Sequence, residues 1–337
     1  MRSLSRPDYP IPTLVESGVG GEKRNAHRAA YSAEGTVPDK FEDHWNKPDV
    51  RGLLHAMQGH VCAYCGLEER TLDVEHFRPK GAVYGEDDTP GYWWLAYEAS
   101  NYFFGCPACN QKRKSKKFPL LANATRITYE TRERLPQEER VLLDPVKDAP
   151  VEKWFHLEWN DPTCKLLPAP GLDASDESRI EDVIDFFNLN MDAVVRRRRS
   201  AAYEKAVRTA ELGNWKEVRR LAMRHYEHSF IARFVLLELR QVLPTPEEEA
   251  EDLAGHLWDD MREQVAEILN LRQRGKAPAR QDLRQLESYG WALVVLQNQV
   301  QGDVVGELLA RRLGAEQDPG VREEILKLFR KLCVGVQ

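Results

Sequence analysis

The sequence predicts a mainly helical α+β protein in which a small cysteine-rich module with short strands is set among helices. Three observations support this fold class. Four of the six cysteines fall between residues 62 and 109, the strand-like alternations are short, and apolar residues follow helical spacing over much of the second half. With 337 residues, of which 42% are hydrophobic, the chain is long enough for more than one compact unit.

The charge balance and the lack of long apolar runs narrow the functional classes. The formal net charge is −6, so any nucleic-acid-binding surface would have to be local. The first 18 residues hold no apolar run of signal-peptide length, and no later window approaches a membrane span. We therefore expect a cytoplasmic protein without a membrane partner, in which clustered cysteines bind metal rather than form disulfides.

Residues 1–47 are expected to form an N-terminal arm, and the module is expected to occupy residues 48–125. Its first element is predicted from "KPDVRGLLHAMQG", residues 47–59, where apolar side chains recur at helical spacing. Gly59 supplies a stop signal at the end of this segment. The predicted helix therefore ends just before the first cysteine pair.

Two Cys-x-x-Cys pairs form the strongest local signal in the chain. Each pair lets two thiolates converge on one ion, and two pairs complete the tetrahedral four-sulfur shell of structural zinc. The candidate ligands are Cys62, Cys65, Cys106 and Cys109. The alternative of four unrelated buried cysteines is disfavoured by the paired spacing and by Gly66 and Pro107 at the two knuckles. The separate Cys164 and Cys333 are assigned to packing.

The segment "TLDVEHF", residues 71–77, alternates apolar and acidic residues and predicts a half-buried strand that ends near Pro79. Strict alternation places Glu75 and His76 on opposite faces of this strand. We therefore expect a bend or bulge if both side chains serve one site. Taken alone, the pair has a second interpretation, an exposed carboxylate beside a structural histidine.

A basic segment accompanies the second cysteine pair. Asn110 directly follows Cys109, so zinc binding would fix the backbone beside this asparagine. Between Asn101 and Arg126 there are six basic residues and no acidic ones. They are Lys112, Arg113, Lys114, Lys116, Lys117 and Arg126. The run predicts a local phosphate-binding patch, with a solvated helix face as the alternative.

The ordered motifs "DVEHFRPK", "CPACN", "LLDP" at residues 142–145 and "FFNLN" at residues 186–190 give a family resemblance. Together they resemble the HNH endonucleases, and in particular the HNH proteins of bacterial anti-phage systems. These include the nuclease subunit of Septu and HNH proteins attached to certain retrons. The resemblance implies a zinc-stabilised, treble-clef-like ββα-metal module. In that module a hairpin around Glu75 and His76 precedes a helix that starts near Asn110.

The resemblance also implies a role for each motif residue. His76 stands at the position of the general base, which takes a proton from the attacking water. Glu75 and Asn110 stand at positions that hold Mg²⁺ or Mn²⁺, and Asn101 stands at a position that holds the histidine and its strand in place. Because the first carboxylate is Glu rather than the commoner Asp, Asp73 is a second candidate ligand.

The implied activity is metal-dependent hydrolysis of DNA as the effector of an anti-phage system. Its implied partners are DNA and a companion ATPase or other defence subunit. Several basic residues are expected to hold flanking phosphates: Arg78, Lys80, Lys112, Arg113, Lys114 and Lys117. Two alternatives stay open, namely a zinc-stabilised nucleic-acid-binding adaptor that does not cut and an RNA-directed nuclease.

The rest of the chain is expected to be an extension and a helical domain. Residues 126–243 should add short strands at "RVLLDP" and "WFHLEW", then helices from about residue 176. The prolines and acidic run of "VLPTPEEEAED" indicate a boundary, after which residues 244–337 form a C-terminal helical domain. This domain is expected to bind a partner, to dimerise or to regulate the nuclease.

Overall fold

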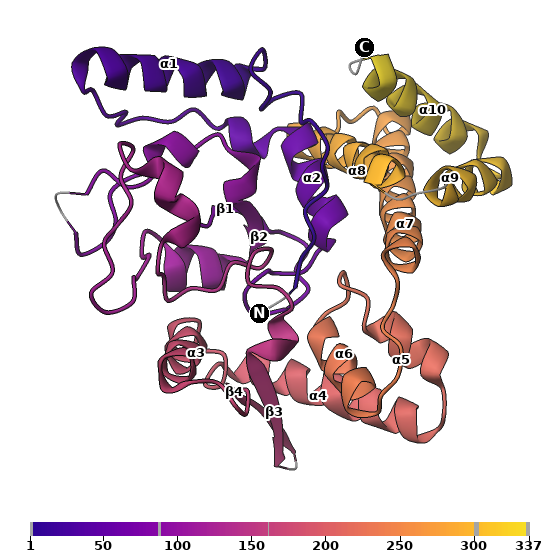
Figure 1. The fold of residues 1–337 in the computed structure, drawn as a ribbon. Coiled ribbons are helices and arrows are strands. Elements are labelled where there is room, and N and C mark those ends of the chain that lie inside the picture. Colours follow the sequence, from indigo (N-terminus) through magenta and orange to yellow (C-terminus); the bar gives the residue numbers. More distant parts are fainter. Residues whose placement is uncertain (1–2, 87–88, 161, 300–302, 335–337) are drawn as a thin grey trace. The chain divides into compact units, whose positions relative to one another are not determined.

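The computed structural model describes residues 3–86, 89–160, 162–299 and 303–334 (Figure 1). Within these ranges the protein is mainly helical, with two small two-stranded sheets, so the α+β class is confirmed. No helix in the described ranges is long and apolar enough to cross a membrane.

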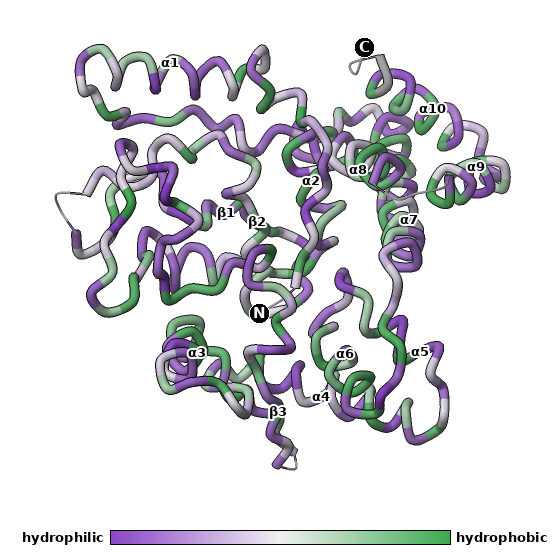
Figure 2. The backbone as a smooth tube through the Cα atoms, viewed as in Figure 1, coloured by the Kyte–Doolittle hydropathy of each residue, from purple (hydrophilic) through white to green (hydrophobic). Residues whose placement is uncertain are grey.

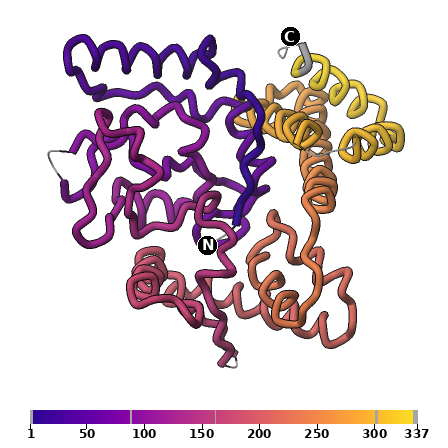
Figure 3. Tube along the Cα trace, viewed as in Figure 1, coloured from indigo at the N-terminus to yellow at the C-terminus, as the bar shows by residue number. Residues whose placement is uncertain are grey.

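The chain forms two compact units. The first unit contains Met1–Ser5, His27–Phe41 and His60–Pro244, and the second contains Arg6–Ala26, Glu42–Gly59 and Thr245–Gln337. The backbone therefore passes repeatedly from one unit to the other, a path that Figure 3 follows by colour from the N-terminus. Residues 1–47, expected as an arm, contain the helix α1 (Val19–Glu34) and the 3₁₀ helix η1 (His44–Asn46).

The first unit is built around two antiparallel ribbons. Its strands are β1 (Asp73–His76), β2 (Tyr102–Gly105), β3 (Phe155–Asn160) and β4 (Thr163–Pro168). Its short helices are η2 (Trp93–Leu95), η3 (Ala99–Asn101), η4 (Ala108–Lys114), η5 (Arg132–Gln137) and η6 (Val151–Lys153). Its longer helices are α3 (Ala174–Phe186), α4 (Ala193–Glu211), α5 (Trp215–Leu221) and α6 (Ser229–Glu238).

Two sequence expectations for this unit have different outcomes. The strand expected at "WFHLEW" is present as β3, which pairs with β4. The strand expected at "RVLLDP" is wrong, because the structure has only the isolated bridge between Leu120 and Arg140 in this segment. The Asp144 carboxylate accepts hydrogen bonds from the amides of Val146 and Lys147, which turns the backbone instead of extending it.

The second unit is helical, with α2 (Pro48–Gln58), α7 (Pro246–Gln273), α8 (Arg280–Gln299), α9 (Val304–Ala315) and α10 (Pro319–Val334). The predicted helix before the first cysteine pair is confirmed as α2, and Gly59 ends it with a φ of 58°. Gly52 lets α2 approach α8 closely, since a Cβ at this position would lie 2.4 Å from the Cβ of Trp291. Thr245 and Glu248 form a capping box that starts α7 at the predicted boundary.

The cores of both units come from amphipathic elements. Hydrophobic and hydrophilic residues alternate around helices such as α7 and α10 (Figure 2). In the second unit the apolar face of α7 buries Leu257, Trp258 and Met261. In the first unit β2 is buried along its whole length. Pairing with this buried strand fixes the position of β1.

Candidate functional site

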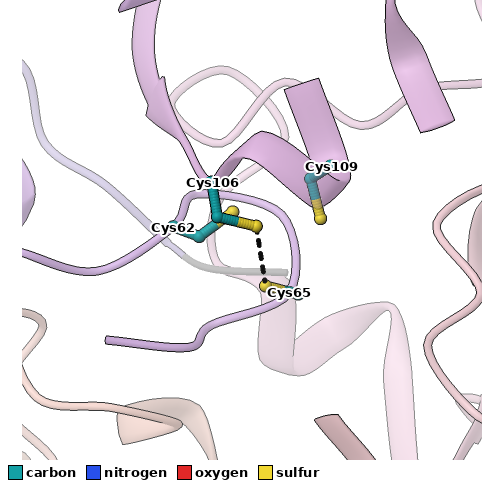
Figure 4. Close-up of side chains that lie close together, drawn as sticks. All are labelled: Cys62, Cys65, Cys106 and Cys109. Carbon is teal, nitrogen blue, oxygen red and sulfur yellow. Dashed lines mark hydrogen bonds between the residues drawn. The ribbon is translucent and has the colours of Figure 1, made fainter. Parts of the chain in front are cut away.

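The four cysteines of the two Cys-x-x-Cys pairs come together in the first unit (Figure 4). All four sulfur atoms lie within 4.8 Å of one another, and the Sγ atoms of Cys65 and Cys106 are 3.7 Å apart. Tetrahedral zinc with bonds of about 2.3 Å needs sulfur atoms about 3.8 Å apart. The predicted cluster is therefore confirmed, and its donor set and size fit a zinc ion.

Local backbone structure explains the convergence of these thiols. In the first knuckle the Cys62 amide donates to the Leu67 carbonyl, and the Gly66 amide donates to the Cys62 carbonyl. Gly66 has a φ of 79°, and a Cβ on it would lie 3.1 Å from Nδ1 of His228. In the second knuckle, Cys106 follows β2 directly and its carbonyl accepts from the Asn110 amide.

The cluster favours a thiolate at Cys62. Burial disfavours the charged sulfur, but hydrogen bonds from Cys106, Cys109 and Cys65 outweigh this effect and lower the pKa of Cys62 well below its usual value. Thiolate is the form that binds metal. Arg113 adds a positive charge at the edge of the cluster, since its Nη1 atom lies 3.5 Å from Sγ of Cys109.

Glu75 lies on β1 with its side chain almost fully buried. Its Oε1 atom is 2.5 Å from Nζ of Lys114, and the Tyr64 hydroxyl lies 3.5 Å from the same oxygen. Burial raises the pKa of Glu75, and the ammonium groups of Lys114 and Lys80 oppose that shift. The carboxylate is therefore held inside the protein by an adjacent buried cation.

His76 is the last residue of β1 and faces the other side of the ribbon. Its Nε2 atom lies 3.1 Å from the Ala96 carbonyl, and its ring packs edge-on against Tyr102, whose hydroxyl also donates to Ala96. A carbonyl can only accept, so this contact requires the proton on Nε2 and leaves the lone pair of a neutral ring on Nδ1.

The surroundings of His76 favour the neutral ring. Burial lowers its pKa well below the usual value, and the charges of Lys80 and Lys114 lower it further, whereas the hydrogen bond to Ala96 raises it. Lys80 and Lys114 thus influence the pKa values of both Glu75 and His76. The two acid–base groups share one electrostatic environment.

The expected bend between these two residues is not found in β1. Pairing with β2 runs without interruption from Asp73, opposite Gly105, to His76, opposite Tyr102. Regular alternation therefore places the side chains of Glu75 and His76 on opposite faces. Glu75 shares its face with Lys114 and Tyr64, while His76 packs against Tyr102 and Ala96.

Asn110 lies on the same side of the ribbon as Glu75. A Cβ built on Gly105 would be 3.2 Å from Cβ of Asn110 and 3.5 Å from Cβ of Glu75, so both side chains start beside this glycine. Nδ2 of Asn110 donates to Oδ2 of Asp73 at 3.0 Å. Because a carboxylate only accepts, this bond fixes which end of the Asn110 amide faces Asp73.

Asn101 binds backbone groups around the end of β1. Its Oδ1 atom accepts from the Arg78 amide at 2.8 Å, and its Nδ2 atom donates to the carbonyls of Arg78 and Leu95. Its own carbonyl accepts from the Phe77 amide. Asn101 therefore fixes the chain on both sides of Phe77, directly after His76.

The basic residues that were expected to hold phosphates fall into different environments. Lys112 and Lys117 are exposed and Lys80 is half-buried, whereas Arg113 forms an ion pair with Asp192. Arg78 and Lys114 are buried and bind the carboxylates of Glu138 and Glu75. Arg78 and Lys114 therefore do not have the phosphate-binding role that the sequence predicts, because each neutralises an acidic side chain inside the fold, away from solvent.

Sequence reasoning missed the buried partners of this site. Tyr64 lies in the first knuckle and Glu138 lies 60 positions after Arg78. Neither belongs to a motif, and the spacing of charges along the chain gives no signal for either contact. The one indirect signal is physical, since a carboxylate on a half-buried strand needs a cation nearby.

The chain is similar to the Septu protein PtuB of Bacillus mycoides (strain KBAB4), with 33% identity over 141 residues. The similarity covers 40% of this chain and 46% of the Bacillus protein, so the chain spans about half the length of this relative. No protein-family model matches the sequence, and no solved structure is significantly similar. The expected resemblance to Septu is confirmed, whereas the HNH family assignment stays a prediction.

Proposed function

We propose that this protein is a metal-dependent endonuclease that hydrolyses DNA as the effector of a bacterial anti-phage system. The observation that carries the proposal is the convergence of Glu75 and Asn110 beside Gly105 on one face of the β1–β2 ribbon, next to a cysteine cluster that fits zinc. His76 leaves the opposite face at the end of β1, so the proposal requires that a single phosphate is reached from both faces of this strand end. Similarity to a Septu protein supports the defence role.

Glu75 and Asn110 are the residues that would hold Mg²⁺ or Mn²⁺. Their side chains start at the same glycine, and hard divalent cations prefer carboxylate and amide oxygens. The hydrogen bond from Nδ2 of Asn110 to Asp73 leaves Oδ1 as the oxygen for the ion. When bound, the ion neutralises charge that develops on the phosphate and on the leaving 3′ oxygen.

His76 is proposed to accept the proton of the attacking water through Nδ1. The bond from Nε2 to Ala96 fixes this tautomer, and the lowered pKa keeps the ring neutral near pH 7. As the water loses its proton to His76, its oxygen bonds to phosphorus and the bond to the 3′ oxygen breaks. Asn101 acts as a positioning residue, because it ties the backbone next to His76 in place.

The exposed cations of η4 and its following turn are proposed to contact DNA phosphates. Lys112, Lys116 and Lys117 are accessible, while Arg78 and Lys114 are excluded from this role by their burial. Contacts of this kind weaken as salt rises and carry little sequence information. A companion ATPase or other defence subunit is the proposed source of control.

The proposal is tested by incubating the protein with plasmid DNA and with RNA, in Mg²⁺ or in EDTA. We expect DNA cleavage that requires the divalent ion and falls about 10²–10⁴-fold in His76→Ala. His156→Ala is the matched control, because His156 lies on β3 and packs against Phe234 outside the site. Cleavage of RNA but not of DNA would show that the protein is an RNA nuclease instead.

A second candidate is a zinc-stabilised adaptor that binds nucleic acid without cutting it. The buried ion pair of Glu75 with Lys114 favours it, since a carboxylate already neutralised in this way has a structural role. This candidate predicts nucleic-acid binding that is unchanged in His76→Ala and no cleavage under any condition. A folded, zinc-containing His76→Ala protein that cuts at the wild-type rate would overturn the proposed mechanism.

A further inference from the structure

Lys114 places a buried ammonium group in the proposed ion site. Its side chain has no exposed surface, and its Nζ atom lies 2.5 Å from Oε1 of Glu75 and 2.9 Å from the carbonyl oxygen of His76. A buried charge is tolerated only when partners replace the water that it loses. Glu75 and His76 both belong to β1, so Lys114 binds the strand that carries the proposed catalytic groups.

The helix η4 explains why this lysine points inward while its neighbours do not. The Ser115 amide donates to the Asn110 carbonyl five residues earlier, which is the hydrogen bond of a π-helix. In this wider turn Lys114 follows almost one full turn after Asn110 and lies on the same side. Glu75, Asn110 and the Lys114 ammonium therefore converge on one region beside Gly105.

We propose that Lys114 is a resident cation that competes with the divalent ion for Glu75 and thereby sets the affinity of the site for that ion. The inference rests on the proposed function, because it assumes that Glu75 and Asn110 hold a divalent ion. An ion that takes Oε1 of Glu75 must displace or approach a fixed positive charge, and like charges in a buried site repel strongly. Tight binding therefore requires that Lys114 withdraws from Glu75.

The test measures Mn²⁺ affinity by titration calorimetry on the full chain, independently of cleavage. We expect Lys114→Met to bind Mn²⁺ at least about tenfold more tightly than the wild type, because the competing charge is gone. Lys114→Arg keeps the charge and is expected to show no such gain. Glu75→Gln combined with Lys114→Met is expected to lose the gain, since the competition acts at the Glu75 carboxylate.

Thermal unfolding gives a second readout if Lys114→Met is less stable. Loss of the cation leaves the Glu75 carboxylate buried and unpaired, so the melting temperature of the zinc-loaded protein without added Mn²⁺ should fall. Mn²⁺ should then raise the melting temperature more in Lys114→Met than in the wild type, because ligand binding to the native state adds stability. An equal or smaller rise in the variant would count against the competition.

Two sets of results separate the role of Lys114 from the nuclease activity. Suppose that the wild type binds Mn²⁺ through Glu75 and cuts DNA, but Lys114→Met binds Mn²⁺ equally or less well. Lys114 then does not compete with the ion, and the proposed nuclease activity is unaffected. If neither protein binds Mn²⁺ and the wild type does not cut DNA, both proposals are overturned.

Discussion

Arg78 and Glu138 form a buried ion pair in the first unit, with Nε of the arginine 2.7 Å from Oε2 of the glutamate. The other oxygen of Glu138 accepts from the Tyr92 hydroxyl and from the Ile127 amide. The pair joins the segment directly after β1 to a segment 60 positions later. A residue that resembles a phosphate-binding arginine in the sequence therefore stabilises the backbone that follows His76.

We expect Arg78→Met to destabilise the first unit by about 3–5 kcal/mol, because it leaves the Glu138 carboxylate buried without its cation. Urea unfolding followed by tryptophan fluorescence measures the effect. The double variant Arg78→Met with Glu138→Gln should lose less than the sum of the two single changes, since both charges leave together. An Arg78→Met protein with wild-type stability but weaker DNA binding would instead indicate a phosphate contact.

Zinc is expected at about one ion per chain, and its loss should destabilise the first unit. Cys109→Ala removes one of four sulfur ligands, so native mass spectrometry should show a chain without the zinc mass. Its melting temperature should fall to that of the wild type treated with a strong chelator. Cys164→Ala is the matched control, because Cys164 is equally buried but lies outside the cluster. Full zinc occupancy in Cys109→Ala would exclude this residue as a ligand.

The features that could be predicted from the sequence are those with a local cause. Helix α2 follows from the apolar spacing of residues 47–59, and the cysteine cluster follows from two Cys-x-x-Cys pairs. Strand β3 follows from its alternating pattern. Each of these signals lies in short segments of the chain, and only the cysteine cluster joins two such segments that are far apart in the sequence.

The environment of the site could not be predicted because it depends on distant contacts. Lys114 looks like its neighbours in a lysine-rich run, yet it alone of Lys112, Lys114, Lys116 and Lys117 is buried. Which lysine turns inward depends on the π-helical turn of η4 and on the carboxylate of Glu75, 39 positions earlier. Sequence periodicity based on 3.6 residues per turn does not identify that residue.

His256 on α7 gives a prediction about pH. Its pKa is raised by the hydrogen bond from the ring to Asp252, one turn earlier, and by the charges of Asp260 and Asp259, while burial opposes the shift. A raised pKa means that the pair stabilises the folded state fully below about pH 6.5, the unfolded value, and loses this contribution as pH rises through the folded pKa.

Titration of the His256 ring by NMR should therefore give a midpoint above about 6.5. Asp252→Asn should lower that midpoint, and the difference in unfolding free energy between the two proteins should be a few tenths of a kcal/mol at pH 6 and smaller at pH 9. Glu267→Gln, on the same helix, is the control and should leave the midpoint in place. A midpoint unaffected by Asp252→Asn would contradict the assignment of the shift to this pair.

Asp73 is expected to act on the proposed ion site through Asn110. Its Oδ2 atom accepts from Nδ2 of Asn110 at 3.0 Å and from Nε2 of Gln111 at 2.7 Å. Asp73→Ala frees the Asn110 amide to rotate, so Mn²⁺ affinity should fall about 10–100-fold, as for other residues that orient a metal ligand.

Gln111→Ala removes the other hydrogen bond to the same carboxylate and should change Mn²⁺ affinity little. Both variants should keep their zinc. If the two variants lose affinity equally, orientation of Asn110 by Asp73 is not the cause; if Asp73→Ala loses far more than Asn110→Ala, Asp73 binds the ion itself.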